Sequence, residues 1–231
     1  MSHVYAGVLE QLGPRILDGR LAPETSLTLE WLQTEFGVSR TIAREVVQVL
    51  ASMGLVESRR RTGVRIRPPA DWDHFDPAVI RWRLDGDDRA AHLHDLSQLR
   101  AAVEPPSAAL AAAHADPTVR VEIVRLAEAM EVAGAAADLA SFLDLDIAFH
   151  RMLLEASGNI MFGALGDVVE EVLRGRTDHD LMPREPKPEA RRLHLMVAHG
   201  VADGDADVAR SAMHAICVEV VSQMQGRLPR P

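Results

Sequence analysis

The sequence is poor in cysteine, in aromatic residues and in long hydrophobic runs. Its single cysteine, Cys217, excludes an internal disulfide framework and fits a reducing cytoplasm. Aromatic residues make up only 4% of the chain, whereas alanine and leucine are abundant, which favours helices over sheets. There is no run of about 18 uncharged apolar residues, and no basic N-terminal segment precedes an apolar one. We therefore expect a mainly α-helical, cytoplasmic protein without a transmembrane segment or a secretory signal.

Charge is distributed unevenly along the chain. The 231 residues carry a net charge of −9, yet residues 1–70 hold nine Lys/Arg against seven Asp/Glu. Within residues 39–67, seven arginines accompany two glutamates, a net charge of +5, whereas residues 71–231 carry −11. Phosphate binding depends on the local field rather than on the charge of the whole chain. A basic N-terminal region on an acidic body is therefore compatible with DNA binding.

Residues 1–69 are predicted to form a winged helix-turn-helix domain, with three helices followed by a β-hairpin that we call the wing. The predicted elements are helices over 2–18, 28–36 and 39–52 and strands over 55–58 and 63–67. Gly37 can adopt the positive φ of a tight turn between helices, and Ser39 is a favourable N-cap. Arg40 and Arg44 are one turn apart, so they share one face of the third helix.

The third helix begins with hydroxyl and arginine side chains, which the major groove of DNA accepts. The wing has an arginine-rich tip that would touch the DNA backbone or the minor groove. A merely solvated loop is the alternative for that tip. The predicted DNA-contacting residues are Ser39, Arg40, Thr41, Arg44, Arg59, Arg60, Arg61, Thr62 and Gly63.

The rest of the chain is predicted to be helical. Residues 70–88 are expected to be a linker with a short helix, and residues 89–231 an all-α bundle. The expected helices of the bundle are 89–114, 117–133, 138–156, 160–177, 189–203 and 206–226. A kink is expected where Pro105 and Pro106 interrupt the first of them. The polar, proline-rich segment 178–188 is expected to be an exposed loop.

Two groups of polar residues in the bundle suggest ligand binding. Asp146 and His150 are four residues apart on one helical face, a spacing that suits a carboxylate and an imidazole binding one divalent metal. Buried, hydrogen-bonded histidines in a metal-free pocket are the alternative. Arg100 can clamp a carboxylate with two parallel hydrogen bonds, or it can form an ordinary ion pair with Glu104 one turn away.

These residues together resemble the GntR family of bacterial transcription regulators over nearly the whole chain. The segment FGVSRTIAREVVQVLASMGLVE, residues 36–57, is similar to the winged helix of that family. The remainder resembles the all-helical FCD domain of its fatty-acid-regulator-like branch, in LRAAVEP (99–105), DIAFH (146–150), ASGN (156–159), His194 and the Gly-Asp pair at 204–205. The linker WDHFDPAVIRW, residues 72–82, is similar to that of galactonate-operon repressors in the family.

The resemblance implies a homodimeric repressor that binds double-stranded operator DNA and is released by a small carboxylate such as a sugar acid. It implies that Asp146, His150 and His194 hold a divalent metal (zinc, nickel or manganese). The effector would contact these three residues and Arg100. The family's fourth ligand position is Ile216 here, so a three-ligand site with an open position is expected.

Two other functions are compatible with the sequence. A metal-dependent hydrolytic enzyme would use Asp146, His150 and His194 to activate water, although no further general acid or base with clear spacing accompanies them. A metal-free regulator would instead respond to an acyl-CoA-type ligand. We expect the DNA-binding regulator and no enzymatic activity.

Overall fold

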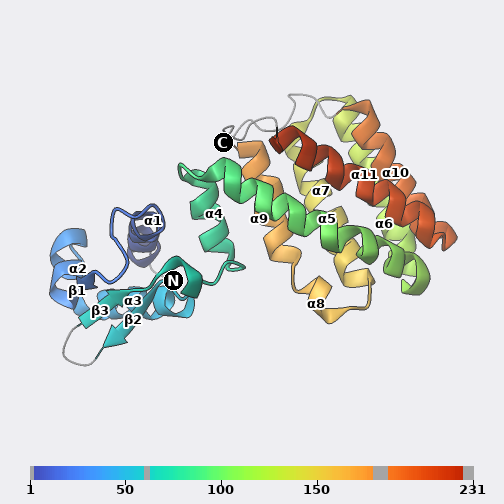
Figure 1. Ribbon diagram of the computed structural model, residues 1–231. Helices are drawn as coiled ribbons and strands as arrows, with labels where there is room; N and C mark the ends of the chain where they lie inside the picture. The colour runs from blue at the N-terminus through green and yellow to red at the C-terminus, as the bar shows by residue number, and fades with distance from the viewer. Residues whose placement is uncertain (1–2, 60–62, 179–186, 226–231) are drawn as a thin grey trace. The chain divides into compact units, whose positions relative to one another are not determined.

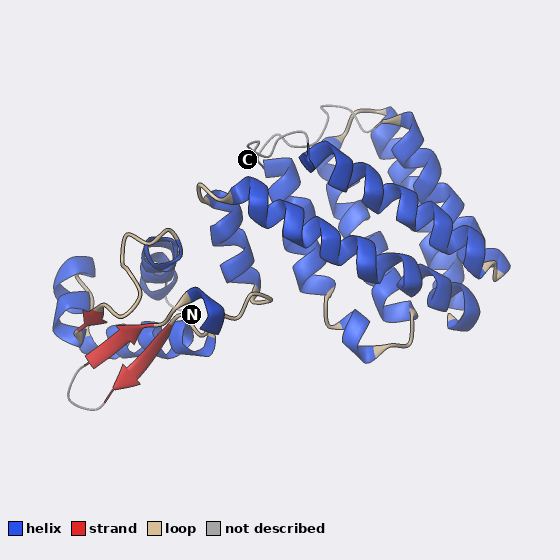
Figure 2. Ribbon diagram, in the orientation of Figure 1, coloured by secondary structure: helices blue, strands red, loops and turns tan. Residues whose placement is uncertain are grey.

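The computed structural model describes residues 3–59, 63–178 and 187–225. The chain divides into two compact units, at residues 89 and 90. Among the described residues, strands occur only in the first unit, and helices dominate both units (Figures 1 and 2). The predicted mainly α fold, with a winged helix-turn-helix domain followed by helices, is therefore confirmed. Among the described helices, none combines the length and apolarity that a bilayer crossing requires.

The first unit packs three helices against a small sheet, followed by a short 3-10 turn and one further helix. Its elements are α1 His3–Leu17, β1 Ser26–Leu27, α2 Leu29–Phe36, α3 Arg40–Ser52, β2 Val56–Arg59, β3 Gly63–Ile66, η1 Pro69–Asp71 and α4 Pro77–Asp85. The sheet is antiparallel with β3 in the centre, and Ser26 pairs with Arg65. Strand β1 was not predicted, because two residues are too few to show an alternating pattern.

The turn between α2 and α3 has the predicted geometry. The side chain of Thr28 caps α2, and that of Ser39 caps α3 by accepting a hydrogen bond from the backbone N–H of Ile42 at 3.3 Å. Gly37 ends α2 with a φ of 63°, a left-handed conformation that glycine adopts at little cost. The start of α3 is therefore fixed by local sequence.

Helix α4 packs on α1 within the first unit. The ring of Trp82 lies against Gly13 so closely that a Cβ at that position would be 2.3 Å from the ring. The indole N–H of Trp82 also donates to Glu10 at 2.6 Å, and Arg81 donates to the same carboxylate at 2.8 Å. The short helix predicted in segment 70–88 is thus present, and it belongs to the core of the first unit.

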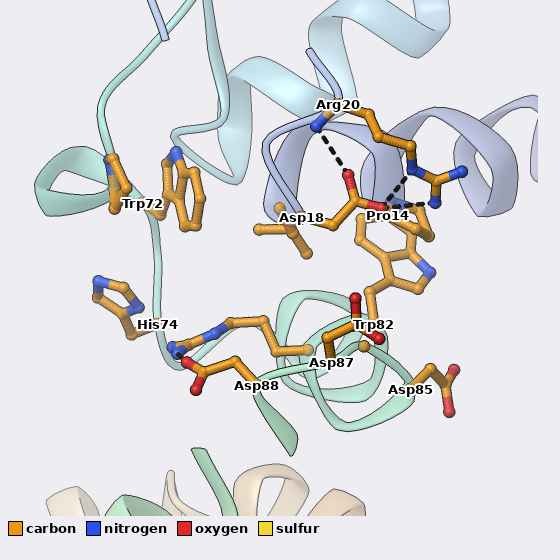
Figure 3. Close-up of a pocket in the computed structure, with 13 residues that line it drawn as sticks. Pro14, Asp18, Arg20, Trp72, His74, Trp82, Asp85, Asp87 and Asp88 are labelled. Atoms are coloured by element: carbon orange, nitrogen blue, oxygen red, sulfur yellow. Dashed lines mark hydrogen bonds and ion pairs between the residues drawn. The ribbon is translucent and has the colours of Figure 1, made fainter. Parts of the chain in front are cut away.

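A pocket of about 460 Å³ lies in the first unit between the end of α1, the η1 segment and α4 (Figure 3). Trp72, His74 and Trp82 supply aromatic walls, and the acidic residues around them are Asp18, Asp85, Asp87 and Asp88. Arg20 pairs with Asp18, and Arg83 lies 3.5 Å from Asp88. Because acidic residues outnumber basic ones here, the pocket is unfavourable for a phosphate group.

The second unit is entirely helical in its described residues. Its helices are α5 Arg89–His114, α6 Pro117–Ala135, α7 Leu139–Ala156, α8 Ile160–Gly163, α9 Gly166–Asp178, α10 Pro188–Asp203 and α11 Ala206–Gln225. Helix α7 packs against α6 and α9, and α10 packs against α6 and α11. The shared core consists mainly of aliphatic side chains, and it includes two phenylalanines, Phe142 and Phe149.

The main difference from the prediction concerns residues 160–177. The single predicted helix is wrong, because the chain forms the short α8 and then α9, with a break at Ala164 and Leu165. Gly163 and Gly166 flank this break, and glycine is a poor helix former. Helix α5, in contrast, continues as one helix through Pro105 and Pro106. Most of the predicted loop 178–188 lies outside the described residues.

Candidate functional site

Helix α3 presents a polar face to solvent and an apolar face to the core. Ala43, Val46, Val47 and Leu50 are buried, whereas the predicted DNA-contacting residues Ser39, Arg40, Thr41 and Arg44 are all exposed. The first turn of α3 thus presents hydroxyl and guanidinium groups together. An α-helix with this face fits a DNA major groove.

Two neighbours of this face, Gln48 and Glu30, are not among the predicted DNA contacts. Gln48 is exposed one turn after Arg44, and its amide is suited to the edge of an adenine. Glu30 of α2 lies 3.9 Å from Arg40, and both side chains are largely exposed. Such a pair is weak in water, so Arg40 can exchange it for a phosphate.

The predicted contacts of the wing are only partly described. Arg60, Arg61 and Thr62 lie outside the described residues, and only the backbone of Arg59 is placed, at the end of β2. Gly63 begins β3 with a φ of 91°, and a Cβ there would lie 2.5 Å from the carbonyl oxygen of Leu27. Gly63 therefore permits the close approach of β3 to β1, and DNA contact by the wing stays a prediction.

In the second unit, α7 and α10 bring the three predicted metal ligands together. Asp146 and His150 lie on α7 and His194 on α10, and each is at most 4% exposed. The Oδ1 atom of Asp146 is 3.3 Å from Nε2 of His150 and 3.1 Å from Nε2 of His194. One possible ligand atom from each residue lies within 4.8 Å of the others.

The chemistry of this cluster fits a bound divalent ion. Oδ1 of Asp146 and Nε2 of His194 are buried, and neither makes a hydrogen bond of proper geometry. Leaving such atoms unsatisfied is costly. Two ligand atoms that each bind one ion at about 2.1 Å lie roughly 3.0–3.4 Å apart. Oδ1 of Asp146 and Nε2 of His194 have such a separation, 3.1 Å. The ring of His194 is also oriented, because its Nδ1 lies 2.7 Å from the carbonyl oxygen of Ala190 and Nε2 is left facing Asp146.

Glu104 on α5 orients His150 from behind. Its Oε2 atom is 2.6 Å from Nδ1 of His150, and its Oε1 atom accepts a hydrogen bond from Nε of Arg100 at 2.5 Å. Burial opposes ionisation of Glu104, but Arg100 and His150 outweigh it and lower its pKa to about 2. A carboxylate behind a histidine is a common support for metal ligands. From the sequence, Glu104 was predicted only as a possible ion-pair partner of Arg100.

Two buried arginines have unsatisfied donors. Arg100 forms the ion pair with Glu104 that was one of the two roles predicted for it. The Nη1 atom of Arg100 nevertheless has no hydrogen-bond partner. Arg176 on α9 was not predicted, and its buried Nε also has no partner. Burial and the nearby charge of Arg100 lower the pKa of Arg176 to about 10. The signal was present in the sequence, since Arg176 interrupts the apolar face formed by Val169 and Val172.

The remaining residues near this cluster are apolar or already bonded. The thiol of Cys217 is buried 3.8 Å from Oε2 of Glu104, and burial raises its pKa. Ile216, at the family's fourth ligand position, is buried in the core of the unit. His214 is exposed and is not part of the cluster.

The comparisons with known proteins agree with both halves of this description. The model of the "Bacterial regulatory proteins, gntR family" matches residues 4–66, and the FCD domain model matches residues 95–218. The chain belongs to the GntR family, with an FCD domain. This family membership makes it a DNA-binding transcription regulator whose FCD domain binds small-molecule effectors.

Individual relatives extend over most of this GntR-family chain. The galactonate operon transcriptional repressor of Escherichia coli (strain K12) is 28% identical and aligns with 87% of this chain and 88% of its own. A probable D-xylose utilization operon transcriptional repressor of Paenarthrobacter nicotinovorans is 26% identical, over 86% of this chain and 78% of its own. The solved structure of Listeria monocytogenes Lar has a TM-score of 0.62 at 19% identity, covering 99% of both chains, and supports the fold.

Proposed function

We propose that this protein is a repressor that binds its operator as a homodimer and leaves it when a small carboxylate binds the FCD domain. The observation that carries the proposal is the set of buried, unsatisfied polar atoms on Arg100, Asp146 and His194. Burying polar atoms of this kind is costly unless a ligand forms a hydrogen bond or a coordinate bond with them. They lie in the effector-binding domain of a DNA-binding family.

The DNA-binding half of the proposal rests on α3. Ser39, Arg40, Thr41 and Arg44 enter the major groove, and Arg59–Gly63 of the wing touch the backbone or the minor groove. Two copies bind a pseudo-palindromic operator whose half-sites are about 34–36 Å apart. The effector weakens binding because it favours a dimer in which the two α3 helices no longer match that spacing.

The effector half rests on the buried cluster. Asp146, His150 and His194 would hold a zinc, nickel or manganese ion, which would supply positive charge for an acid's oxygen atoms. Because Ile216 offers no ligand atom, one further position stays open for that oxygen. Arg100 would donate a hydrogen bond to the same acid through Nη1. The name of the galactonate relative favours a sugar acid as effector.

The two alternative functions explain less. A hydrolytic enzyme would need a free general acid or base near the metal, and Glu104 is already bound by Arg100 and His150. An acyl chain would leave the unsatisfied donors of the cluster unpaired. The regulator that binds a small acid is therefore favoured over both.

Thermal unfolding with a panel of sugar acids, with and without a chelator, tests the effector half. An acid at 100 times its Kd stabilises the protein by about 2.7 kcal/mol, which raises Tm by about 5–11 °C for a unit of this size. His194→Ala should abolish the shift, whereas His199→Ala, at an exposed position on the same helix, should retain it. If no acid raises Tm in the metal-loaded protein, the proposed effector class is wrong.

A further inference from the structure

The second buried arginine, Arg176, has no role in the site described so far. It lies on α9 and is 6% exposed, and its Nε is a buried donor without a partner. No carboxylate of the described residues forms an ion pair with it. The two acidic groups whose charges reach it are Asp146 and Glu104. Glu104 is paired with Arg100 and His150, and Asp146 faces the two histidines.

A buried arginine without a counterion destabilises a fold. Removing a guanidinium from water costs several kcal/mol unless an anion and hydrogen bonds compensate it. The neighbours of Arg176 on the inner face of α9, Val169, Val172 and Leu173, are buried and apolar, so they offer no compensation. Burial and the charge of Arg100 both lower the pKa of Arg176, so both disfavour its charged form.

The charges of the whole cluster indicate how many negative charges are missing. Arg100, Arg176 and a divalent ion would contribute four positive charges, and Glu104 and Asp146 contribute two negative ones. Histidines that bind a metal are neutral. The metal-loaded cluster therefore carries a net charge of +2 in a buried environment. A monoanion would leave one of these charges uncompensated.

We propose that the effector is a small dicarboxylate, with one carboxylate at the metal and Arg100 and the second on Arg176. The inference rests on the proposed function and narrows it from acids in general to diacids. Among sugar acids it selects those with a carboxylate at both ends. Arg176 is the residue that distinguishes them from monoacids, since it would form a charge-assisted hydrogen bond only with the second carboxylate.

Matched pairs of acids test this selection. Galactonate and galactarate, gluconate and glucarate, and lactate and malate each differ by one carboxylate. Isothermal titration of the zinc-loaded full chain should show that the diacid of the fitting pair binds about ten- to a hundredfold more tightly than its monoacid, as expected for one hydrogen bond to a charged group.

Two variants on α9 assign the selection to Arg176. Arg176→Gln should reduce the difference between diacid and monoacid to less than about threefold, which is under 1 kcal/mol. Arg174→Gln removes an arginine that is half-exposed and paired with Glu170, and it should keep the preference. Without ligand, Arg176→Gln should unfold at or above the temperature of the wild type, because it removes an unpaired buried charge.

The outcomes separate this inference from the function on which it rests. If monoacids bind the wild type as tightly as diacids, the diacid inference is overturned and the acid-responsive repressor stands. If no acid of any pair binds, both are overturned. If Arg176→Gln unfolds well below the wild type, Arg176 is a structural residue and the inference fails even though acids bind.

Discussion

Glu104 is the residue whose replacement tests the buried cluster most severely. Both of its oxygens accept hydrogen bonds, Oε1 from Arg100 and Oε2 from Arg100 and His150. Glu104→Gln keeps the shape of the side chain but replaces one oxygen with an amide that donates. At least one N–H group of Arg100 or His150 would then face another donor, and the charge of Arg100 would lose its partner.

The expected loss of stability follows from the burial of this pair. Arg100 and Glu104 are each only 2% exposed, so water cannot replace the lost interaction. Breaking a buried ion pair on one side typically costs about 3–5 kcal/mol. At about 2–4 °C per kcal/mol for a chain of this size, the Tm of the FCD domain should fall by about 6–20 °C.

Thermal unfolding with chelator present measures this loss without a contribution from metal. Glu122→Gln is the matched control, because Glu122 is paired with Arg125 on the outer face of α6; it should change Tm little. The double variant Arg100→Met/Glu104→Gln should be more stable than Glu104→Gln alone, since the unpaired charge is gone. A Tm for Glu104→Gln equal to that of Glu122→Gln would refute the buried cluster as described.

Three further predictions follow, two on DNA binding and one on the sheet of the first unit. Arg44→Ala should abolish the gel shift of operator DNA, whereas Arg125→Ala, on the FCD domain, should leave it unchanged; equal shifts would exclude Arg44 from the interface. Operator affinity should fall steeply with salt, by about 10³–10⁵ between 50 and 200 mM for 6–10 phosphate contacts; a flat profile would contradict α3 and wing docking. Gly63→Ala should destabilise the first unit by about 1–3 kcal/mol, because of its positive φ and the close carbonyl of Leu27; an unchanged denaturation midpoint would show that β3 relaxes around a methyl group.

The sequence predicted the fold best where periodicity was long and its ends were marked. Helix α3 is an example, since the cap Ser39 and the apolar positions up to Leu50 agree. Prediction from the sequence failed where an element was too short to show a periodic pattern of apolar residues, as in the two-residue β1. The prediction also failed between Gly163 and Gly166, where two glycines flank a break that the helical pattern on either side did not reveal.

The site was predicted where its residues are neighbours in sequence. Asp146 and His150 followed from their spacing on one helix, whereas His194, 44 positions after His150, entered only through the family resemblance. The contact between Glu104 and His150 joins α5 to α7 and has no local signature. Arg176 had a signal, a charge within an apolar face, but sequence alone does not show whether such a charge has a partner.

The most direct test of the central claim is operator affinity measured by fluorescence anisotropy as a function of acid concentration. The labelled duplex is the DNA upstream of the gene for this protein, and the acid is the one that most raises Tm in the metal-loaded chain. We predict that a saturating concentration of the acid raises the operator Kd at least about tenfold, the effect of 1.4 kcal/mol of coupling, and that His194→Ala binds the duplex without responding. An operator Kd that stays the same at every acid concentration would contradict a repressor released by its effector.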